Sequence, residues 1–98
     1  MQMEITITEA ATDWYERELD VETGDALRFF VRYGGVGGRI PGFSLGIATE
    51  QPDSILTSTV VNGITYFIDT VDAWYFENND LMIEFDEQLD EPQFTYKA

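Results

Sequence analysis

Six of the chain's eight glycines fall within one short stretch, residues 32–47, which reads RYGGVGGRIPGFSLGI. Consecutive glycines expose backbone N–H groups that can cradle a phosphate, most often at the start of a helix. Nucleotide-binding loops add a Lys-Ser or Lys-Thr pair, which is missing here, and Pro41-Gly42 leads into a predicted strand. Arg39 alone supports an anion site. The simpler alternative is a turn whose glycines supply positive φ angles.

The glycines are nevertheless more numerous than a turn requires. Four of the five residues 34–38 are glycine, and each costs up to about 1 kcal/mol relative to alanine on folding. This surplus predicts that something approaches the backbone closely. An arginine fork and a phenol beside it contrast with the acidic remainder of the chain, and we predict that a protein partner or a small ligand binds there. The candidate binding residues are Arg32, Tyr33, Gly34, Gly35, Val36, Gly37, Gly38, Arg39 and Phe43.

Carboxylates suggest two other chemistries. The densest acidic group could bind a hard cation such as Ca²⁺ or Mg²⁺, but it lacks the regular spacing and glycine turn of an oxygen-ligand loop, so a solvated acidic edge is the alternative. Asp69 and Asp72 could act as acid and base, although helix capping explains both more simply. The acidic group comprises Glu84, Asp86, Glu87, Asp90 and Glu91.

The composition excludes more chemistry than it suggests. No cysteine and no histidine occur among the 98 residues, which removes the thiolate nucleophile, the disulfide, the thiolate metal site and the imidazole base. We therefore expect no enzymatic activity, no metal site and no cofactor. A net charge of −14 disfavours nucleic acid and anionic membranes as partners. The first residues, MQMEI, show no secretory signal, so we expect a cytoplasmic protein.

Hydrophobic periodicity predicts an α+β domain spanning residues 1–98, with a small, mainly antiparallel or mixed sheet and two helices. Thr8 is expected to cap a helix ending near Asp20, and Thr70 to cap a short second helix. Asn62-Gly63 predicts a type I′ hairpin turn. Residues 87–92 read as a loop or frayed end, and residues 93–96 as a last edge strand or a mobile end. The predicted strands are 3–8, 27–33, 43–48, 55–61, 64–69 and 81–85. The helical residues predicted to face the core are Ala11, Trp14, Tyr15, Leu19, Val71, Trp74, Tyr75 and Phe76.

Four segments occur in an order and spacing that resemble the HesB/IscA-like family, the A-type iron–sulfur carrier proteins. They are "ITITEAA", "LRFFVRYGG", "GFSLGI" and "VVNGITYFID", and the likeness covers residues 3–86. The resemblance implies a HesB-like fold and leaves homo-oligomers open, although the large negative charge resists self-association.

In cluster-carrying members of that family, one cysteine lies in the glycine segment and a closely spaced pair lies near the carboxyl end. The resemblance places the first near Val36 and the pair in or beyond residues 94–97, and this chain inserts a few residues within 37–41. Every thiol is absent, and thiolates are the chief ligands of cluster iron. The sequence thus indicates a cysteine-free HesB-like branch: a non-enzymatic binding or accessory protein related to iron–sulfur biogenesis, or an acidic metal-binding or protein-interaction module.

Overall fold

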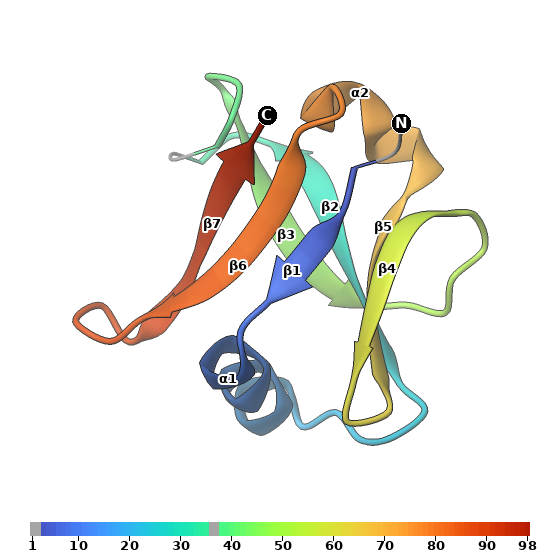
Figure 1. Cartoon of the computed structure of the whole chain (residues 1–98), viewed down its shortest axis with the longest axis vertical. Coiled ribbons are helices and arrows are strands. Elements are labelled where there is room, and N and C mark those ends of the chain that lie inside the picture. Colours follow the sequence, from blue (N-terminus) through green and yellow to red (C-terminus); the bar gives the residue numbers. More distant parts are fainter. Residues whose placement is uncertain (1–2, 36–37) are drawn as a thin grey trace.

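The computed structural model describes residues 3–35 and 38–98 and shows an α+β fold, as the sequence predicts. Two helices, a short 3₁₀ helix and seven strands are formed by the described residues (Figure 1). The helices are α1 (Glu9–Leu19), η1 (Thr70–Asp72) and α2 (Ala73–Phe76). The strands are β1 (Ile5–Ile7), β2 (Ala26–Tyr33), β3 (Phe43–Thr49), β4 (Ile55–Val61), β5 (Ile64–Asp69), β6 (Asp80–Asp86) and β7 (Glu91–Lys97).

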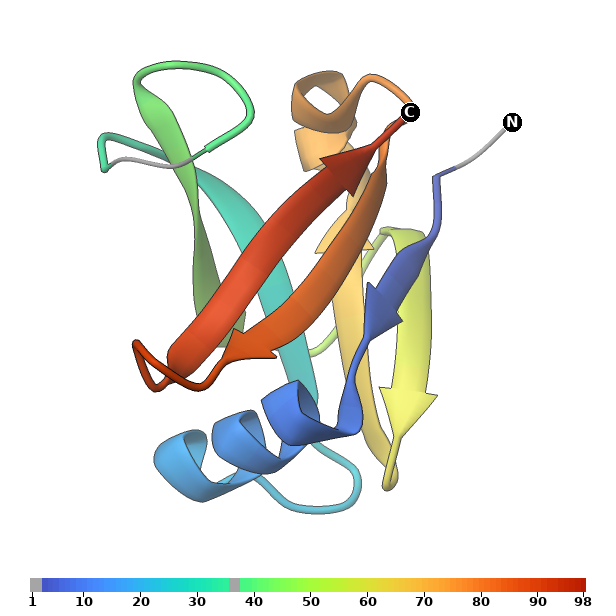
Figure 2. The same cartoon turned by 60° about the vertical axis from the view of Figure 1, so that its left-hand side comes forward.

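The strands form two mixed sheets. One has the order β1-β6-β7, with β1 parallel and β7 antiparallel to β6. The other has the order β3-β2-β5-β4, in which β2 and β5 are parallel and both outer pairs are antiparallel. The sheets face each other, with α1 at one end of the molecule and α2 at the other (Figure 2). None of the described helices is long and apolar enough to cross a membrane.

The core lies between the sheets and is rich in aromatic rings. Phe29 on β2 stacks on Tyr66 of β5, and the edge of Phe94 from β7 packs against Phe29 from the opposite sheet. Burial of such rings is the main contribution to the stability of the folded state. The buried core residues are Met3, Ile5, Ala11, Tyr15, Leu27, Phe29, Ile64, Tyr66, Ile68, Tyr75, Phe76, Leu81 and Ile83.

The local signals of the hairpin and of the first helix are confirmed. Asn62 and Gly63 both have positive φ, as a type I′ turn requires, and join β4 to β5. Thr8 accepts a hydrogen bond from the backbone N–H of Ala11, and the helix ends at Asp20 in the left-handed conformation. Leu19 is an exception to the predicted stripe, since it is exposed at the last turn.

The short helical region after β5 differs from its prediction. Asp69, not Thr70, is the cap, because its side chain accepts from the N–H of Val71. The region begins as a 3₁₀ turn with three residues per turn, so the 3.6-residue period used to predict its buried side does not hold there. Val71 and Trp74 are therefore exposed, and Tyr75 is buried as predicted.

The carboxyl end is ordered. Glu91–Lys97 forms β7, an edge strand paired with β6 over its whole length, so the edge-strand alternative is confirmed. Phe94 and Tyr96 point toward the core because period-two alternation places them on the same face of β7. The connecting turn is held by Asp86, whose carboxylate accepts from the N–H groups of Gln88 and Leu89.

Candidate functional site

The glycine segment closes the β2–β3 hairpin. The antiparallel ladder runs up to the Tyr33–Phe43 pair, and the Gly34 N–H then donates to the Gly42 carbonyl at 2.7 Å. A strand, not a helix, follows the segment. It therefore lacks the helix start at which a phosphate loop gathers its N–H groups. Val36 and Gly37 lie outside the described residues.

The close approach that the surplus glycines predict is made by the chain itself. A Cβ on Gly38 would overlap the carbonyl oxygen of Phe43 and lie 2.7 Å from the hydroxyl of Tyr75. At Gly46 on β3, a Cβ would lie 2.6 Å from the ring of Phe30 across the ladder. These glycines therefore let neighbouring parts of the same protein pack against bare backbone.

Arg39 ties the glycine segment to α2. Its backbone N–H donates to the Tyr75 hydroxyl at 2.5 Å, and its Nε donates to the Tyr75 carbonyl at 2.8 Å. One guanidinium nitrogen also lies 2.6 Å from a carboxylate oxygen of Glu77. The sequence suggested that Arg39 could hold an anion, but the structure shows its guanidinium engaged within the chain. Its role here is to fix the segment in place.

An exposed aromatic surface results from this arrangement, and we call Tyr33, Phe43 and Trp74 the aromatic group. The Phe43 ring packs edge-on against Tyr33 and Trp74, with centroids 5.7 and 5.4 Å apart. Tyr33 is 86% exposed and Trp74 is 52% exposed. The prediction from sequence included Tyr33 and Phe43. It missed Trp74 because the helical period assigned that residue to the core.

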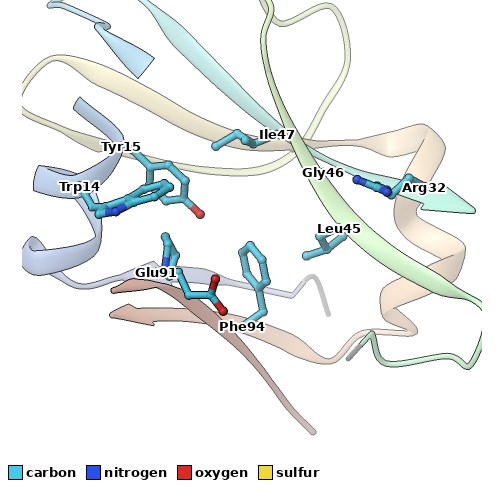
Figure 3. Close-up of a pocket in the computed structure, with 9 residues that line it drawn as sticks. Trp14, Tyr15, Arg32, Leu45, Gly46, Ile47, Glu91 and Phe94 are labelled. Carbon is cyan, nitrogen blue, oxygen red and sulfur yellow. The ribbon is translucent and has the colours of Figure 1, made fainter. Parts of the chain in front are cut away.

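Arg32 lies apart from the aromatic group. It is exposed, and no acidic side chain among residues 3–35 and 38–98 forms an ion pair with it. It lines a cleft of about 550 Å³ between β3 and β7 (Figure 3). The predicted site residues are thus divided between an aromatic surface at the end of the hairpin and one lip of this cleft.

The cleft is mostly apolar. Trp14 and Tyr15 of α1 form its floor, and Figure 3 shows the Tyr15 hydroxyl pointing into the space bordered by Ile47 and Phe94. Burial, with a contribution from nearby Tyr66, raises the pKa of Tyr15, so this hydroxyl is a neutral donor. The remaining lining residues are Leu45, Gly46, Glu91 and Pro92.

An ion-pair cluster that the sequence did not predict connects β2 to the helical region. The Arg28 guanidinium lies 3.1 Å from Asp72, which is buried, and 3.1 Å from Glu50, which is partly exposed. Burial alone would lower the pKa of Arg28, but the hydrogen bonds to Asp72 and Glu50 outweigh it and raise that pKa. Asp69 and Asp72 do not form an acid–base pair, since one caps the 3₁₀ turn and the other neutralises Arg28.

The carboxyl-terminal region in which the family resemblance places thiols holds a phenol, Tyr96, whereas Val36, near which the resemblance places the other thiol, lies outside the described residues. Gly38 and Arg39 on one side and Tyr96 on the other meet at Tyr75, whose hydroxyl lies 3.5 Å from that of Tyr96. Burial, reinforced by the hydrogen bond with Tyr75, raises the pKa of Tyr96. A phenol held neutral is a poor iron ligand. With no cysteine in the chain, these residues do not fit an iron–sulfur cluster.

The carboxylates do not form a metal centre in the part of the chain that the structure describes. No three acidic side chains of residues 3–35 and 38–98 lie close enough together to hold an ion. In the acidic group after β6, Asp86 stabilises a turn through backbone hydrogen bonds, and Glu84, Glu87, Asp90 and Glu91 are exposed. The solvated-edge alternative accounts for this group.

Comparison with known proteins identifies relatives along nearly the whole chain. The family model described as iron-sulphur cluster biosynthesis matches residues 3–98. A protein of Bacillus subtilis strain 168 named pyruvate dehydrogenase inhibitor is 48% identical over 95 residues, covering 97% of this chain and 100% of its own. An uncharacterized protein of Staphylococcus saprophyticus is 33% identical over 98 residues, covering 97% and 100%. No solved structure matches the chain significantly.

Proposed function

Because the chain belongs to the iron-sulphur cluster biosynthesis family but contains no cysteine, we propose that it is a non-enzymatic binding protein that inhibits a pyruvate dehydrogenase. Inhibition is the activity named for its relative in Bacillus subtilis, which is aligned over its full length at 48% identity. The fold thus serves as a scaffold for a binding surface and not for a cluster.

The aromatic group is the observation that carries this proposal. A tyrosine that is 86% exposed and a tryptophan that is 52% exposed, both packed against Phe43, leave a large apolar area in water that a partner could bury. Tyrosine and tryptophan are the residues that contribute most to protein–protein affinity. They carry little rotamer freedom, and Arg39 fixes the backbone beside them, so the entropic cost of docking is small.

The charge of the chain adds a prediction about its partner. With a net charge of −14, association is fastest with a positively charged surface and slows as salt screens the attraction. Inhibition should therefore weaken as ionic strength rises.

The direct test is titration of the purified chain into the Bacillus subtilis pyruvate dehydrogenase complex while NADH formation is followed. We expect saturable inhibition, and we expect Tyr33→Ala to raise the half-inhibitory concentration at least about tenfold, as for a residue central to an interface. Tyr33 contributes little to folding because it is exposed. Leu89→Ala is the matched control, since Leu89 is also an exposed apolar residue but lies in the β6–β7 turn.

Two results would contradict the proposal. The first is full enzyme activity at a saturating concentration of the chain. The second is equal inhibition by the Tyr33→Ala variant and the unsubstituted chain, which would show that the interface does not include the aromatic group.

An accessory role in iron–sulfur biogenesis is the second candidate, and the family match favours it. The lack of thiols predicts that anaerobic titration with iron and sulfide gives no stable chromophore. A chromophore at stoichiometric iron would show that the chain carries a cluster with other ligands.

A further inference from the structure

Among residues 3–35 and 38–98, no strand pairs with the outer edge of β3, and this free edge differs from the other sheet edges. Its sequence, FSLGIAT, contains no charge and no proline, and its register with β2 is regular over seven residue pairs. Proteins commonly protect an edge strand with charges, proline, bulges or short length. β7 has Glu91, Pro92 and Lys97, the β4–β5 register is irregular between Ile55 and Thr57, and β1 has three residues. The edge of β3 has none of these features.

The hydrogen-bond pattern shows which β3 residues face this edge. Gly34 bonds Gly42 and Glu50 bonds Ala26 through the backbone, at the two ends of the β2–β3 ladder. Hydrogen-bonded pairs alternate with non-bonded pairs in an antiparallel ladder. Leu45 and Ile47 therefore belong to non-bonded pairs, and their N–H and C=O groups point away from β2.

The same two residues line the cleft. The side chains of Leu45 and Ile47 lie on one side of the cleft and Phe94 of β7 on the other (Figure 3), and Pro92 of β7 also lines it. Figure 2 shows β3 and β7 diverging on this side of the molecule, whereas β1 contacts β4 on the opposite side. The cleft volume of about 550 Å³ lies within the range of ligand-binding pockets, about 300–1,000 Å³. Unpaired backbone groups and an apolar cleft thus lie side by side.

We propose that the free edge of β3 binds an extended segment of a partner protein, in which apolar residues alternate with basic ones. The backbone of the segment would pair with Leu45 and Ile47, and its apolar side chains would enter the cleft. The basic residues follow from the net charge of −14 and from exposed Glu91 at the rim, which together outweigh the one positive charge that Arg32 adds to the cleft lining. A second copy of the chain would bring an equal negative charge, which opposes self-pairing.

This inference goes beyond the proposed function, since it concerns a different surface and does not require pyruvate dehydrogenase as the partner. Its test uses direct binding and no enzyme assay, so each proposal can fail without the other.

The probe is a synthetic peptide of alternating valine and lysine, as long as β3, added to ¹⁵N-labelled protein. We expect the amide signals of Leu45 and Ile47 to shift and their hydrogen exchange to slow, because those N–H groups become hydrogen-bonded. Two further peptides carry backbone N-methyl groups on every valine or on every lysine. They have the same charge and side chains, but each lacks the donors along one edge.

Strand addition predicts that one methylated peptide keeps its affinity and that the other loses at least about tenfold, because only one edge of the peptide pairs with β3. Loss with methylated valine indicates an antiparallel arrangement, and loss with methylated lysine a parallel one. Equal binding of both would overturn the proposal and indicate charge attraction or simple insertion of apolar side chains. Absence of binding by the unmethylated peptide would overturn it as well.

A pair of protein variants locates the interaction. Leu45→Lys places a charge in the cleft and should weaken peptide binding at least about tenfold. Val60→Lys changes the net charge equally at an exposed position on β4 and should leave binding within about twofold, as expected for a charge distant from the interface. Equal effects of both variants would contradict the placement. Dimerisation that Leu45→Lys abolishes would assign the edge to a second copy instead.

Discussion

Arg28 provides the sharpest test of how the helical region is held to the sheet. We consider Arg28→Met, which keeps most of the aliphatic stem but removes the guanidinium. The change leaves the Asp72 carboxylate buried without its partner and removes the ion pair of Glu50 with Arg28. Removing one member of a fully buried pair costs about 3–5 kcal/mol, and the 19% exposure of the Arg28 side chain reduces this to about 2–4 kcal/mol.

The assay is urea unfolding monitored by circular dichroism. All variants are fitted with the same slope of unfolding free energy against urea concentration. A domain of this size has about 5–15 kcal/mol of stability, so the variant should fold with a clearly lowered midpoint. Glu50→Gln should cost less than about 1 kcal/mol, because its carboxylate is 42% exposed to solvent. Combining Arg28→Met with Asp72→Asn should recover part of the loss, because no charge then remains buried without a partner.

A cost below about 1 kcal/mol for Arg28→Met would refute this reasoning, since a buried unpaired carboxylate cannot be that cheap. Strict additivity of the two substitutions would refute it too, because it would show that the side chains contribute independently.

Two further predictions concern single atoms. The Tyr66 hydroxyl is buried and has no hydrogen-bond partner among residues 3–35 and 38–98, so Tyr66→Phe should raise the unfolding free energy by up to about 1 kcal/mol at pH 7; a loss of that size would disprove it. Burial, followed by the charges of Glu16 and Asp13, raises the pKa of Tyr66 to about 12. Above pH 10 the folded state therefore binds more protons than the unfolded state, so the free energy of unfolding should fall between pH 10 and 12. The fall should be less steep in the Tyr66→Phe variant. Gly38→Ala should destabilise the chain by about 1–3 kcal/mol and weaken inhibition, because its Cβ would overlap the Phe43 carbonyl. Ala10→Gly is the control for Gly38→Ala, because it also changes one methyl group but at an exposed helical position. A Gly38→Ala variant at least as stable as the unsubstituted chain would show that the overlap does not occur.

Local residue chemistry predicted most elements of this fold, with the 3₁₀ turn after β5 as the exception. The type I′ turn follows from the conformational preferences of Asn62 and Gly63, and the start of α1 follows from the hydroxyl of Thr8. The strands follow from period-two alternation, which the burial of β6 reproduces, whereas in β5 the consecutive residues Tyr66, Phe67 and Ile68 are all buried. The family resemblance is confirmed by the match over residues 3–98. Each of these signals depends on residues close together in the chain.

The candidate site was only partly predictable. Sequence located Tyr33 and Phe43 but assigned Trp74 to the core, since a 3₁₀ turn before α2 changes the period. It also suggested Arg39 as an anion ligand, whereas Tyr75 and Glu77 engage that side chain. No local pattern indicates that residues 36 positions apart will meet.

The sequence by itself determined what this protein lacks and which elements it forms: no thiol or imidazole, a charge of −14, and the strands and helices set by neighbouring residues. Only the tertiary structure decided which groups are left for a partner. Folding turns Arg28 and Arg39 inward and brings Trp74 to the surface beside Phe43. It also leaves the outer edge of β3 without a strand partner among the described residues, next to an apolar cleft. The physical reason is that exposure and pairing depend on contacts between distant segments, which residue type and spacing do not encode.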